Sequence, residues 1–387
     1  MNVGSSKFKK IAIVHDYLDV YGGAESVVQA IWELYPDADI YSSTCDESLI
    51  KKFNLFGGKT DRIFFPKWKN HIPKYLRWFV NKLLVADLPL YFYSLDLSKY
   101  DLVISSTAHF AKCLRTSRDQ VHVSYIHTPP RFLYGLKGDI RKRSNLIIAG
   151  LLFPLDVILR FVDKKAAGFP DYLLCNSETV RQRILKFYSR DAKIIFPFAN
   201  IDMAVMAAKP TNLKFEASDY YLVVSRLASF KNIDFIIESC GKNNINLVIA
   251  GSGPDKERLN EIAQKYECIN MLGFISEENK AWLLQNCKAF ICATRDEDFG
   301  MSTLEPMFYG KPVCALRSGG NTETVIENVN GVFFDDLNEN LFLNGIHYLE
   351  TYDMDPVAIK MSVSKFNKER FKTEFGVFID GIKNRKK

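Results

Sequence analysis

Two glutamates, Glu297 and Glu305, stand eight residues apart around a glycine and two hydroxyl residues in the stretch EDFGMSTLE. Carboxylates accept hydrogen bonds from sugar hydroxyls, and helix-start amides behind Gly300 can bind a phosphate. Since proline is comfortable only in the first turn of a helix, Pro306 predicts a helix that begins near Ser302 or Thr303. A second interpretation is structural: residues 302–305 have the pattern of a helix capping box, with Glu297 a solvated loop residue. The capping box explains Glu305 but not the glycine bend before it.

Two basic residues near the middle of the chain could bind the same kind of anion. Arg226 and Lys231 lie five residues apart in SRLASFKN, where a predicted strand ends and a predicted helix begins. A turn between them could hold both cations around one diphosphate, with helix-start amides adding to the site. The alternative is a solvated loop with two ordinary surface cations.

Glycines that follow two predicted strands would permit close approach of the backbone to a ligand. Gly251 begins GSGPDKERL, which lacks the dinucleotide fingerprint because position 256 is Lys rather than Gly. Gly22 and Gly23 occur in YGGAE, where amides at a helix start could reach a phosphate or a sugar. A plain strand-to-helix turn at Gly251, and a turn that needs positive φ at Gly22 and Gly23, explain these glycines about as well.

His127 ends a further predicted strand in YIHTPPR, and Pro129 and Pro130 stiffen the turn behind it. An imidazole at a strand end is suited to proton exchange near neutral pH, although a lone histidine is more often structural. Both interpretations, catalytic and structural, stay open for His127. Arg131 nearby could hold an anion.

These residues need a scaffold that brings strand ends together, and the hydrophobic pattern predicts one. Short apolar runs alternate with longer amphipathic runs, which is typical of an α/β protein with parallel sheets. The pattern opens on a strand at 11–17 and restarts on a strand at 220–227, with a weakly periodic stretch at 200–219 between the halves. Parallel sheets bind ligands at the carboxyl ends of their strands. Two such domains that face each other are expected to carry the candidate residues on the walls of a cleft.

The composition limits the classes of function. A content of 47% hydrophobic and 25% charged residues is typical of a globular protein, and 387 residues exceed one ordinary core. Residues 1–200 hold 29 Lys and Arg against 19 Asp and Glu, so this half suits an anionic partner. No helix-turn-helix, zinc or stacking-sheet motif supports nucleic-acid binding. The eight scattered cysteines form no C-x-x-C pair and are interpreted as reduced core thiols of a cytoplasmic protein.

Taken together and in this order, the motifs resemble those of the family 4 retaining glycosyltransferases. The resemblance runs from YGGAE to SKFNKERFKTEF, and its most specific element is the spacing E-x7-E from Glu297 to Glu305. It implies an α/β fold of two Rossmann-like domains whose parallel sheets face a cleft, called GT-B. The expected domains are 1–200 for the acceptor, 201–365 for the nucleotide sugar, and a C-terminal helix in 366–387 that returns to the first domain. The stretch VSYIHTPPRFLYG looks like the mannosyltransferase branch that builds bacterial O-antigen, capsule or exopolysaccharide.

The resemblance also implies a role for each candidate residue. Glu305 is expected to bind the ribose hydroxyls of the donor, and Glu297 to stabilise the oxocarbenium-like transition state at the sugar. His127 is expected to contact the donor sugar. The remaining positions are expected to surround the donor phosphates and sugar: Arg226, Lys231, Gly251, Gly22, Gly23 and the backbone of Phe299, Gly300, Met301 and Ser302.

The implied reaction moves a hexose, best matched by mannose from GDP-mannose, to a hydroxyl of a glycan or a polyprenyl-diphosphate-linked glycan. Among the D-x-D patterns of the chain, one at 37–39 precedes a strand and another at 296–298 flanks Glu297, so neither of these two stands where a sugar transferase holds a metal. Protein cations are expected to neutralise the leaving diphosphate instead, with no metal cofactor. The alternatives are a nucleotide-sugar binding protein without transfer activity, and an epimerase or phosphorylase of the same fold.

Two basic segments could touch an anionic membrane surface. Residues 59–84 carry seven Lys and Arg, one Asp and two Trp, and residues 141–161 join a basic cluster to an apolar helix. A core helix with a solvated basic edge is the alternative. No apolar run reaches the ~18 residues of a membrane span. The expected location is the cytoplasm, with peripheral attachment to the inner face of the cell membrane.

Overall fold

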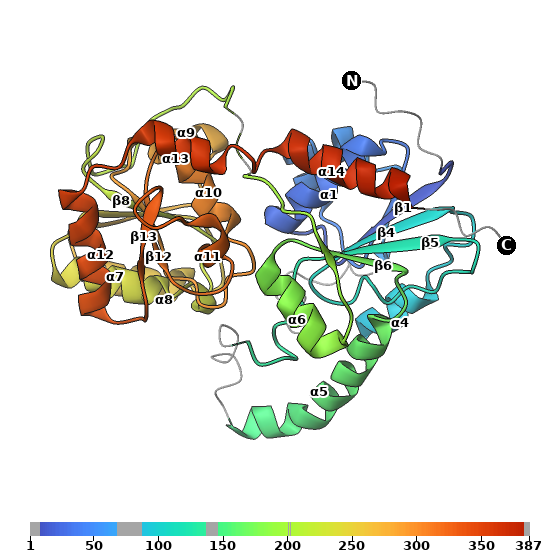
Figure 1. Ribbon diagram of the computed structural model, residues 1–387. Helices are drawn as coiled ribbons and strands as arrows, with labels where there is room; N and C mark the ends of the chain where they lie inside the picture. The colour runs from blue at the N-terminus through green and yellow to red at the C-terminus, as the bar shows by residue number, and fades with distance from the viewer. Residues whose placement is uncertain (1–7, 68–86, 137–145, 200, 202, 383–387) are drawn as a thin grey trace. The chain divides into compact units, whose positions relative to one another are not determined.

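Alternating buried strands and amphipathic helices build two separate parallel sheets in the computed structural model of the chain (Figure 1). The structure describes residues 8–67, 87–136, 146–199, 201 and 203–382, with side chains from residue 153 onward in the segment that begins at 146. The first of two compact units takes its described residues from 1–135, 143–197 and 368–387, and the second mainly from 198–367. The predicted fold class, α/β with two Rossmann-like domains, is confirmed. The chain passes between the units after Pro197 and after Asn367, against predicted limits of 200 and 365.

The first sheet has seven parallel strands in the order β3-β2-β1-β4-β5-β6-β7, so the chain order reverses between β1 and β4. Both of these strands are buried along their whole length, which explains the apolar runs IAIVH and LVI. The strands are β1 Ile11–His15, β2 Asp39–Ser42, β3 Ile63–Phe64, β4 Leu102–Thr107, β5 Val121–Ile126, β6 Tyr172–Cys175 and β7 Lys193–Ile194.

The helices of the first unit include the C-terminal helix of the chain. Phe371 of that helix packs its ring edge-on against Tyr125 of β5, and Lys368 Nζ lies 2.5 Å from Glu33 Oε1 of α1. The C-terminal helix therefore belongs to the first unit, as the resemblance implied. The helices are α1 Gly23–Leu34, α2 Glu47–Lys52, the 3-10 helix η1 Leu55–Gly58, α4 Asp87–Ser94, α5 Leu146–Ala166, α6 Glu178–Tyr188 and α14 Lys368–Gly381.

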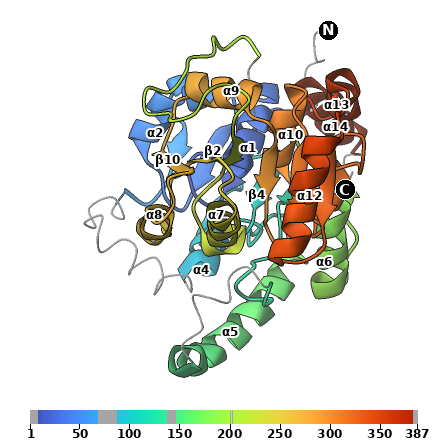
Figure 2. The ribbon, with the colours of Figure 1, turned by 90° about the vertical axis from the view of Figure 1, so that its left-hand side faces the viewer.

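The second sheet has six parallel strands in the order β10-β9-β8-β11-β12-β13, with its reversal between β8 and β11. Its strands are β8 Tyr221–Val224, β9 Leu247–Ala250, β10 Ile269–Gly273, β11 Phe290–Cys292, β12 Val313–Leu316 and β13 Gly331–Phe334. Among its helices, α7 lies between α8 and α12 (Figures 1 and 2). The helices are η5 Ser229–Lys231 (3-10), α7 Ile233–Lys242, α8 Lys256–Ala263, α9 Glu277–Asn286, α10 Met301–Phe308, α11 Asn321–Thr324, α12 Glu339–Thr351 and α13 Pro356–Val363.

All eight cysteines are buried and free, which agrees with their interpretation as core thiols. Burial raises the pKa of Cys113 to about 11 and that of Cys45 to about 12. No helix in the described ranges is both long and apolar enough to cross a membrane. Residues 68–86 and 137–145 lie outside the described residues, so the basic segments predicted at 59–84 and 141–161 are described only in part.

Candidate functional site

Most candidate residues of the second unit follow the two strands between which its strand order reverses. Arg226 and Lys231 come after β8, and Glu297 and the start of α10 come after β11. Lys231 and Ser302 line one small cavity together with the ends of these strands. A crevice at the reversal point is where parallel sheets bind ligands, so this is the expected position for the site.

Glu297 is paired with a cation rather than solvated. Its Oε2 lies 2.8 Å from Nζ of Lys231, and the two side chains are only 14% and 16% exposed. Asn232 holds the Lys231 loop in place by donating from Nδ2 to the Ala293 carbonyl, at the end of β11, at 2.8 Å. The interpretation of Glu297 as a solvated loop residue is therefore wrong. A phosphate bound at Lys231 would have to compete with Glu297 for the charge of this lysine.

A pair of glycines that the sequence interpretation missed fixes the backbone of Glu297. Gly319 forms a parallel bridge with Glu297, and Gly320 N donates to the Glu297 carbonyl at 2.8 Å. A Cβ on Gly319 would overlap that carbonyl, and a Cβ on Gly320 would overlap the backbone of Phe299. Both positions therefore need glycine for close approach. The sequence does show the two glycines, in SGGN after the strand KPVCAL. It does not show that they contact Glu297, which lies about 20 residues earlier in the chain.

Helix α10 begins at Met301, one residue before Ser302. Its cap is Gly300, which is left-handed with φ +91°, and no side chain caps the helix. The predicted capping box is therefore wrong, and it is Thr303 Oγ1 that donates to the Gly300 carbonyl, at 2.6 Å. In the part of the chain that the structure describes, the amides of residues 300–302 donate to no other group. Amides without a partner at a helix start are suited to bind an anion, and anion binding here stays a prediction.

Because α10 begins at Met301, Glu305 lies in its second turn and not in the predicted first turn. Pro306 is likewise inside the helix, where it removes one intrahelical hydrogen bond. Glu305 Oε1 lies 3.6 Å from Nζ of Lys280 on α9, and each side chain is 12% exposed. Burial raises the pKa of Glu305, and the charge of Lys280 opposes this rise. Lys280 was missed because EENKAWLL predicts a helix without showing which element its lysine contacts.

Gly251 has a packing role at the base of the Arg226 loop. Its φ is +141°, and a Cβ there would overlap the Ser225 carbonyl. Leu227 N donates to the Ser252 carbonyl at 3.0 Å, so the SRL and GSG loops interlock. Arg226 is exposed, and its guanidinium pairs with none of the described residues. It is therefore available to a ligand, whereas Lys231 is already paired.

In the first unit, the candidate residues lie around His15, a buried histidine at the end of β1. Its Nε2 lies 3.4 Å from Oε1 of Glu25 on α1, and its Nδ1 lies 2.9 Å from the Ser106 carbonyl oxygen. The Ser106 hydroxyl is 2.8 Å from Nε2 of His127. Burial opposes protonation of His15, but the hydrogen bond and charge of Glu25 outweigh it and raise its pKa. The sequence signal that was missed is the polar pair His15 and Asp16, directly after the apolar run IAIV.

Gly22 and Gly23 begin α1 directly beside Glu25. Gly22 is extended, with φ −157°, and Gly23 has no positive φ either, so a left-handed turn does not explain them. Gly22 O accepts from the amide and the hydroxyl of Ser26 at 3.0 and 2.9 Å. A Cβ on Gly22 would lie 3.3 Å from Glu25 Oε2, which is tight. The glycine leaves the Glu25 carboxylate room next to His15.

Asp16, the residue after His15, is committed to the loop behind β4. Its carboxylate accepts the four consecutive amides of residues 108–111 at 2.7–2.9 Å. Burial opposes its charge, but His109, His15 and the amide donors hold the pKa of Asp16 below its usual range. We assign Asp16 a structural role, because its acceptor capacity is used within the protein.

His127 is held as a neutral imidazole. Burial, and then the charge of His15, lower the pKa of His127 to about 3. Its backbone is fixed on both sides, since its amide donates to the Thr107 carbonyl at 2.8 Å and its carbonyl accepts from Asn176 Nδ2 at 3.0 Å. His127 can therefore make hydrogen bonds to a ligand but does not supply a proton at neutral pH.

A third buried histidine allows a test of how burial acts on a histidine pKa in this unit. His122 lies in β5, with Nε2 2.9 Å from Ser105 Oγ, and burial lowers its pKa to about 3. The unfolded chain binds a proton there below about pH 6.5 and the folded chain does not, so stability falls with acidification by about 1.4 kcal/mol per pH unit. His122→Gln is expected to reduce the loss of unfolding free energy between about pH 7 and pH 5 by about 2 kcal/mol. Urea denaturation at both pH values measures this difference, and equal losses in variant and wild type would contradict it.

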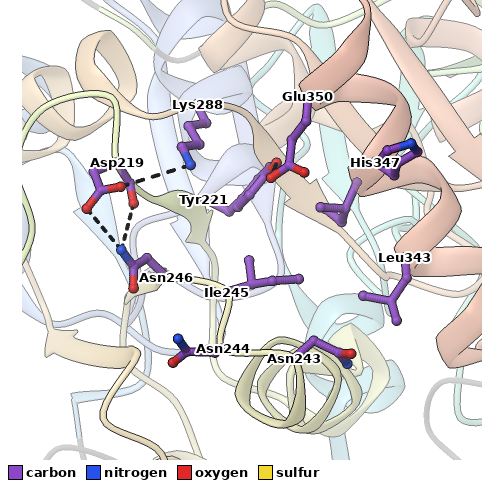
Figure 3. Close-up of a pocket in the computed structure, with 11 residues that line it drawn as sticks. Asp219, Tyr221, Asn243, Asn244, Ile245, Asn246, Lys288, Leu343, His347 and Glu350 are labelled. Atoms are coloured by element: carbon purple, nitrogen blue, oxygen red, sulfur yellow. Dashed lines mark hydrogen bonds and ion pairs between the residues drawn. The ribbon is translucent and has the colours of Figure 1, made fainter.

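A separate cavity of about 470 Å³ lies at the amino ends of strands in the second sheet, opposite the carboxyl ends that carry the candidate site (Figure 3). Its lining includes Asp219, Asn246 and Lys288, which precede β8, β9 and β11, and His347 and Glu350 of α12. Asn246 Nδ2 donates to Asp219 Oδ2 at 3.0 Å. No predicted site residue lines this cavity, and it lies at the amino ends of the strands.

Comparison with known proteins finds similarity to glycosyltransferases. Residues 207–360 match the family described as glycosyl transferases group 1. The chain is similar to the alpha-1,3/1,6-mannosyltransferase ALG2 of Dictyostelium discoideum, with 24% identity over 380 residues that cover 85% of this chain and 87% of that protein. It is also similar to ALG2 of Saccharomyces cerevisiae, with 23% identity over 381 residues, 84% of this chain and 72% of that protein.

Two solved structures share the fold. Anabaena Alr3699/HepE in complex with UDP-glucose has a TM-score of 0.68 and 17% identity, over 96% of this chain and 100% of that one. The lipopolysaccharide outer core galactosyltransferase WaaB in its apo form has a TM-score of 0.62 and 15% identity, over 96% and 99% of the two chains. At these identities the likeness concerns the fold alone.

Proposed function

We propose that this chain, a glycosyltransferase whose residues 207–360 belong to the glycosyl transferases group 1 family, moves a hexose from a nucleotide sugar to a glycan hydroxyl with retention of configuration. We favour mannose from GDP-mannose, because relatives that match most of the chain are named mannosyltransferases. The observation that carries the proposal is the Lys231–Glu297 ion pair, because Lys231 lines one cavity with Ser302 at the start of α10.

Glycosyl transfer develops positive charge at the anomeric carbon and negative charge on the leaving diphosphate. In our proposal, Arg226, Lys231 and the amides of residues 300–302 stabilise the diphosphate. When Lys231 turns to the diphosphate, Glu297 is released beside the sugar, where its carboxylate stabilises the positive charge. One ion pair of the free protein thus provides a partner for each of the two charges that separate.

The remaining residues hold the substrates. Glu305 accepts hydrogen bonds from the ribose hydroxyls, and Lys280 helps to keep this buried carboxylate charged. His127, as a neutral imidazole, offers a hydrogen bond to the sugar. We propose that no metal is needed, because the two cations and the helix start take the part that a divalent ion plays in other sugar transferases.

We further propose a glycan acceptor carried on a polyprenyl diphosphate, at the inner face of the cell membrane. A lipid diphosphate suits the basic first half of the chain, which holds 29 Lys and Arg against 19 Asp and Glu in residues 1–200. The buried free cysteines suit a reducing compartment such as the cytoplasm.

The test is a panel of GDP- and UDP-sugars, measured by thermal shift, by slow hydrolysis, and by transfer to a polyprenyl-diphosphate-linked glycan in the presence of a chelator. We expect stabilisation by one base, with GDP-mannose best, and an α-linked product by NMR. A β-linked product would contradict retention. Stabilisation without hydrolysis or transfer would indicate a binding protein, and activity that is lost in the chelator and restored by Mg²⁺ or Mn²⁺ would contradict metal independence.

A further inference from the structure

Helix α5 of the first unit exposes large apolar side chains along one face. Phe153, Val157, Ile158 and Phe161, called here the α5 stripe, are 60%, 46%, 59% and 69% exposed. Spacings of three and four residues place these side chains together on a helix. Both views show the N-terminal part of α5 extending beyond the other helices of its unit (Figures 1 and 2). Single exposed apolar residues are common, but a contiguous set indicates a binding surface.

The opposite face of α5 is locked onto the first unit. Leu159 is buried in the core, and the fully buried Asp163 forms an ion pair with Lys112. The hydroxyls of Tyr134 and Tyr188 donate to Asp163 Oδ2 at 2.9 and 2.8 Å. Breaking a buried charge pair is costly, so the helix does not roll to hide the stripe.

The charges on the described part of α5 are sorted between its two faces. Arg160, Lys164 and Lys165 are exposed, whereas Asp156 and Asp163 are buried. The outward face of residues 153–166 thus combines apolar groups with cations and carries no carboxylate. This combination is complementary to an anionic lipid surface, where cations meet the headgroups and apolar side chains enter the acyl boundary.

Helix α4 also exposes two large apolar side chains. Leu90 and Tyr93 of that helix are 72% and 45% exposed. The Tyr93 ring lies 6.1 Å from the ring of Phe169, just beyond the end of α5, and the Arg115 guanidinium lies over Tyr93 at 5.9 Å. An aromatic side chain and another cation therefore lie close to the C-terminal end of the stripe helix.

We propose that α5 docks in the interface of an anionic bilayer, with the α5 stripe among the acyl chains and its cations on the lipid phosphates. A bilayer fits better than a protein groove, because positive charge flanks the apolar stripe and no carboxylate interrupts it. The inference rests on the proposed function for its lipid-linked acceptor, and it assigns the membrane contact to one helix face. The surface itself can be tested without any sugar substrate.

The first test compares two double variants in flotation with vesicles of phosphatidylglycerol and phosphatidylcholine. Val157→Ser with Phe161→Ser is expected to weaken binding at least ~10-fold, since it removes two apolar anchors. The matched control is Val377→Ser with Met361→Ser, at positions 66% and 70% exposed on α14 and α13, and it is expected to bind like the wild type. The proposal would be overturned if the stripe variant bound the vesicles as well as the wild type does. It would also be overturned if the wild type did not bind these vesicles.

A second comparison tests the cations. Lys164→Gln with Lys165→Gln is expected to weaken binding roughly 30-fold, because each cation near an anionic surface contributes about 1 kcal/mol. The control is Lys51→Gln with Lys52→Gln, another exposed lysine pair in the last turn of a helix. High salt or vesicles of phosphatidylcholine alone are expected to abolish the difference.

A fluorophore on Val157→Cys reports where the stripe goes. Labelling can be selective, because the eight native cysteines are buried. A blue shift with anionic vesicles and none without lipid supports insertion. A blue shift that rises with protein concentration in the absence of lipid would indicate a second copy as the partner and overturn the proposal.

Hydrolysis of nucleotide sugar, measured without vesicles, separates this inference from the proposed function. The stripe variant is expected to keep the hydrolysis rate of the wild type, which also shows that it is folded. A wild type that binds vesicles but hydrolyses no nucleotide sugar would contradict the function and leave the membrane surface intact. The reverse result would contradict only the membrane surface.

Discussion

Replacing Glu297 by Gln is expected to slow glycosyl transfer by about 100- to 1,000-fold, the usual cost of losing one pre-placed electrostatic group. The affinity for the nucleoside diphosphate is expected to stay the same or to rise. The reason is that Lys231, which lies 2.8 Å from Glu297 Oε2, no longer has to leave a carboxylate in order to bind the phosphates. A purely structural glutamate would instead lose affinity and rate together.

Single-turnover transfer and calorimetry of nucleotide binding measure these two effects. Lys231→Met is expected to weaken nucleotide binding about 10-fold or more, as the loss of a charge-assisted contact does. The double variant Glu297→Gln with Lys231→Met is expected to bind nucleotide like Lys231→Met alone. Without Lys231 there is no ion pair for Glu297→Gln to release, so the effects of the two substitutions on affinity are not additive. Glu261→Gln, at an exposed position of α8, is the control. A Glu297→Gln enzyme that transfers as fast as the wild type would contradict the assigned role.

Glu305 supports the second large effect. Glu305→Gln is expected to weaken nucleotide binding by about 10- to 100-fold, since hydrogen bonds to a charged group contribute about 1.5–3 kcal/mol. The base-independent ribose diol is the contact that is lost, so GDP and UDP are expected to be affected by the same factor. Calorimetry with both nucleotides measures this. A loss for only one of them would place Glu305 at the base instead.

Lys280→Met tests whether nucleotide binding depends on the negative charge of Glu305 or only on the position of its side chain. Burial already raises the pKa of Glu305, and Lys280 is the cation that opposes the rise, so its removal is expected to raise this pKa further. Nucleotide affinity of the variant is then expected to fall as the pH is lowered through the new pKa and to recover as the pH is raised. Glu277→Gln is the matched control of opposite sign, because the charge of Glu277 also raises the pKa of Glu305. Identical pH profiles for the two variants would contradict this account.

Several features of the site were predictable because they depend on local patterns. Apolar runs bounded by glycine and polar residues predicted most of the strands, and the carboxyl-end rule placed Arg226, Lys231 and Glu297 at strand ends. The structure showed that these ends belong to β8 and β11, between which the strand order reverses. The helix start after β11 was also expected, but its exact residue was not. Gly300 adopts φ +91°, so α10 begins earlier than the proline and the S-x-x-E pattern suggested.

The sequence by itself determined the α/β class, the restart of the pattern in the second half and the strand ends that carry polar residues, since these follow from periodicity within a few residues. Only the tertiary structure decided which charges are paired. Lys231 meets Glu297 and Lys280 meets Glu305 across different elements of the second unit, and His15 meets Ser106 across β1 and β4. The same holds for the faces of α5, because the buried contacts of Asp163 with Lys112, Tyr134 and Tyr188 set its orientation. Such pairings depend on how segments that are far apart in the sequence pack against each other, and a pattern within a few residues does not specify that packing.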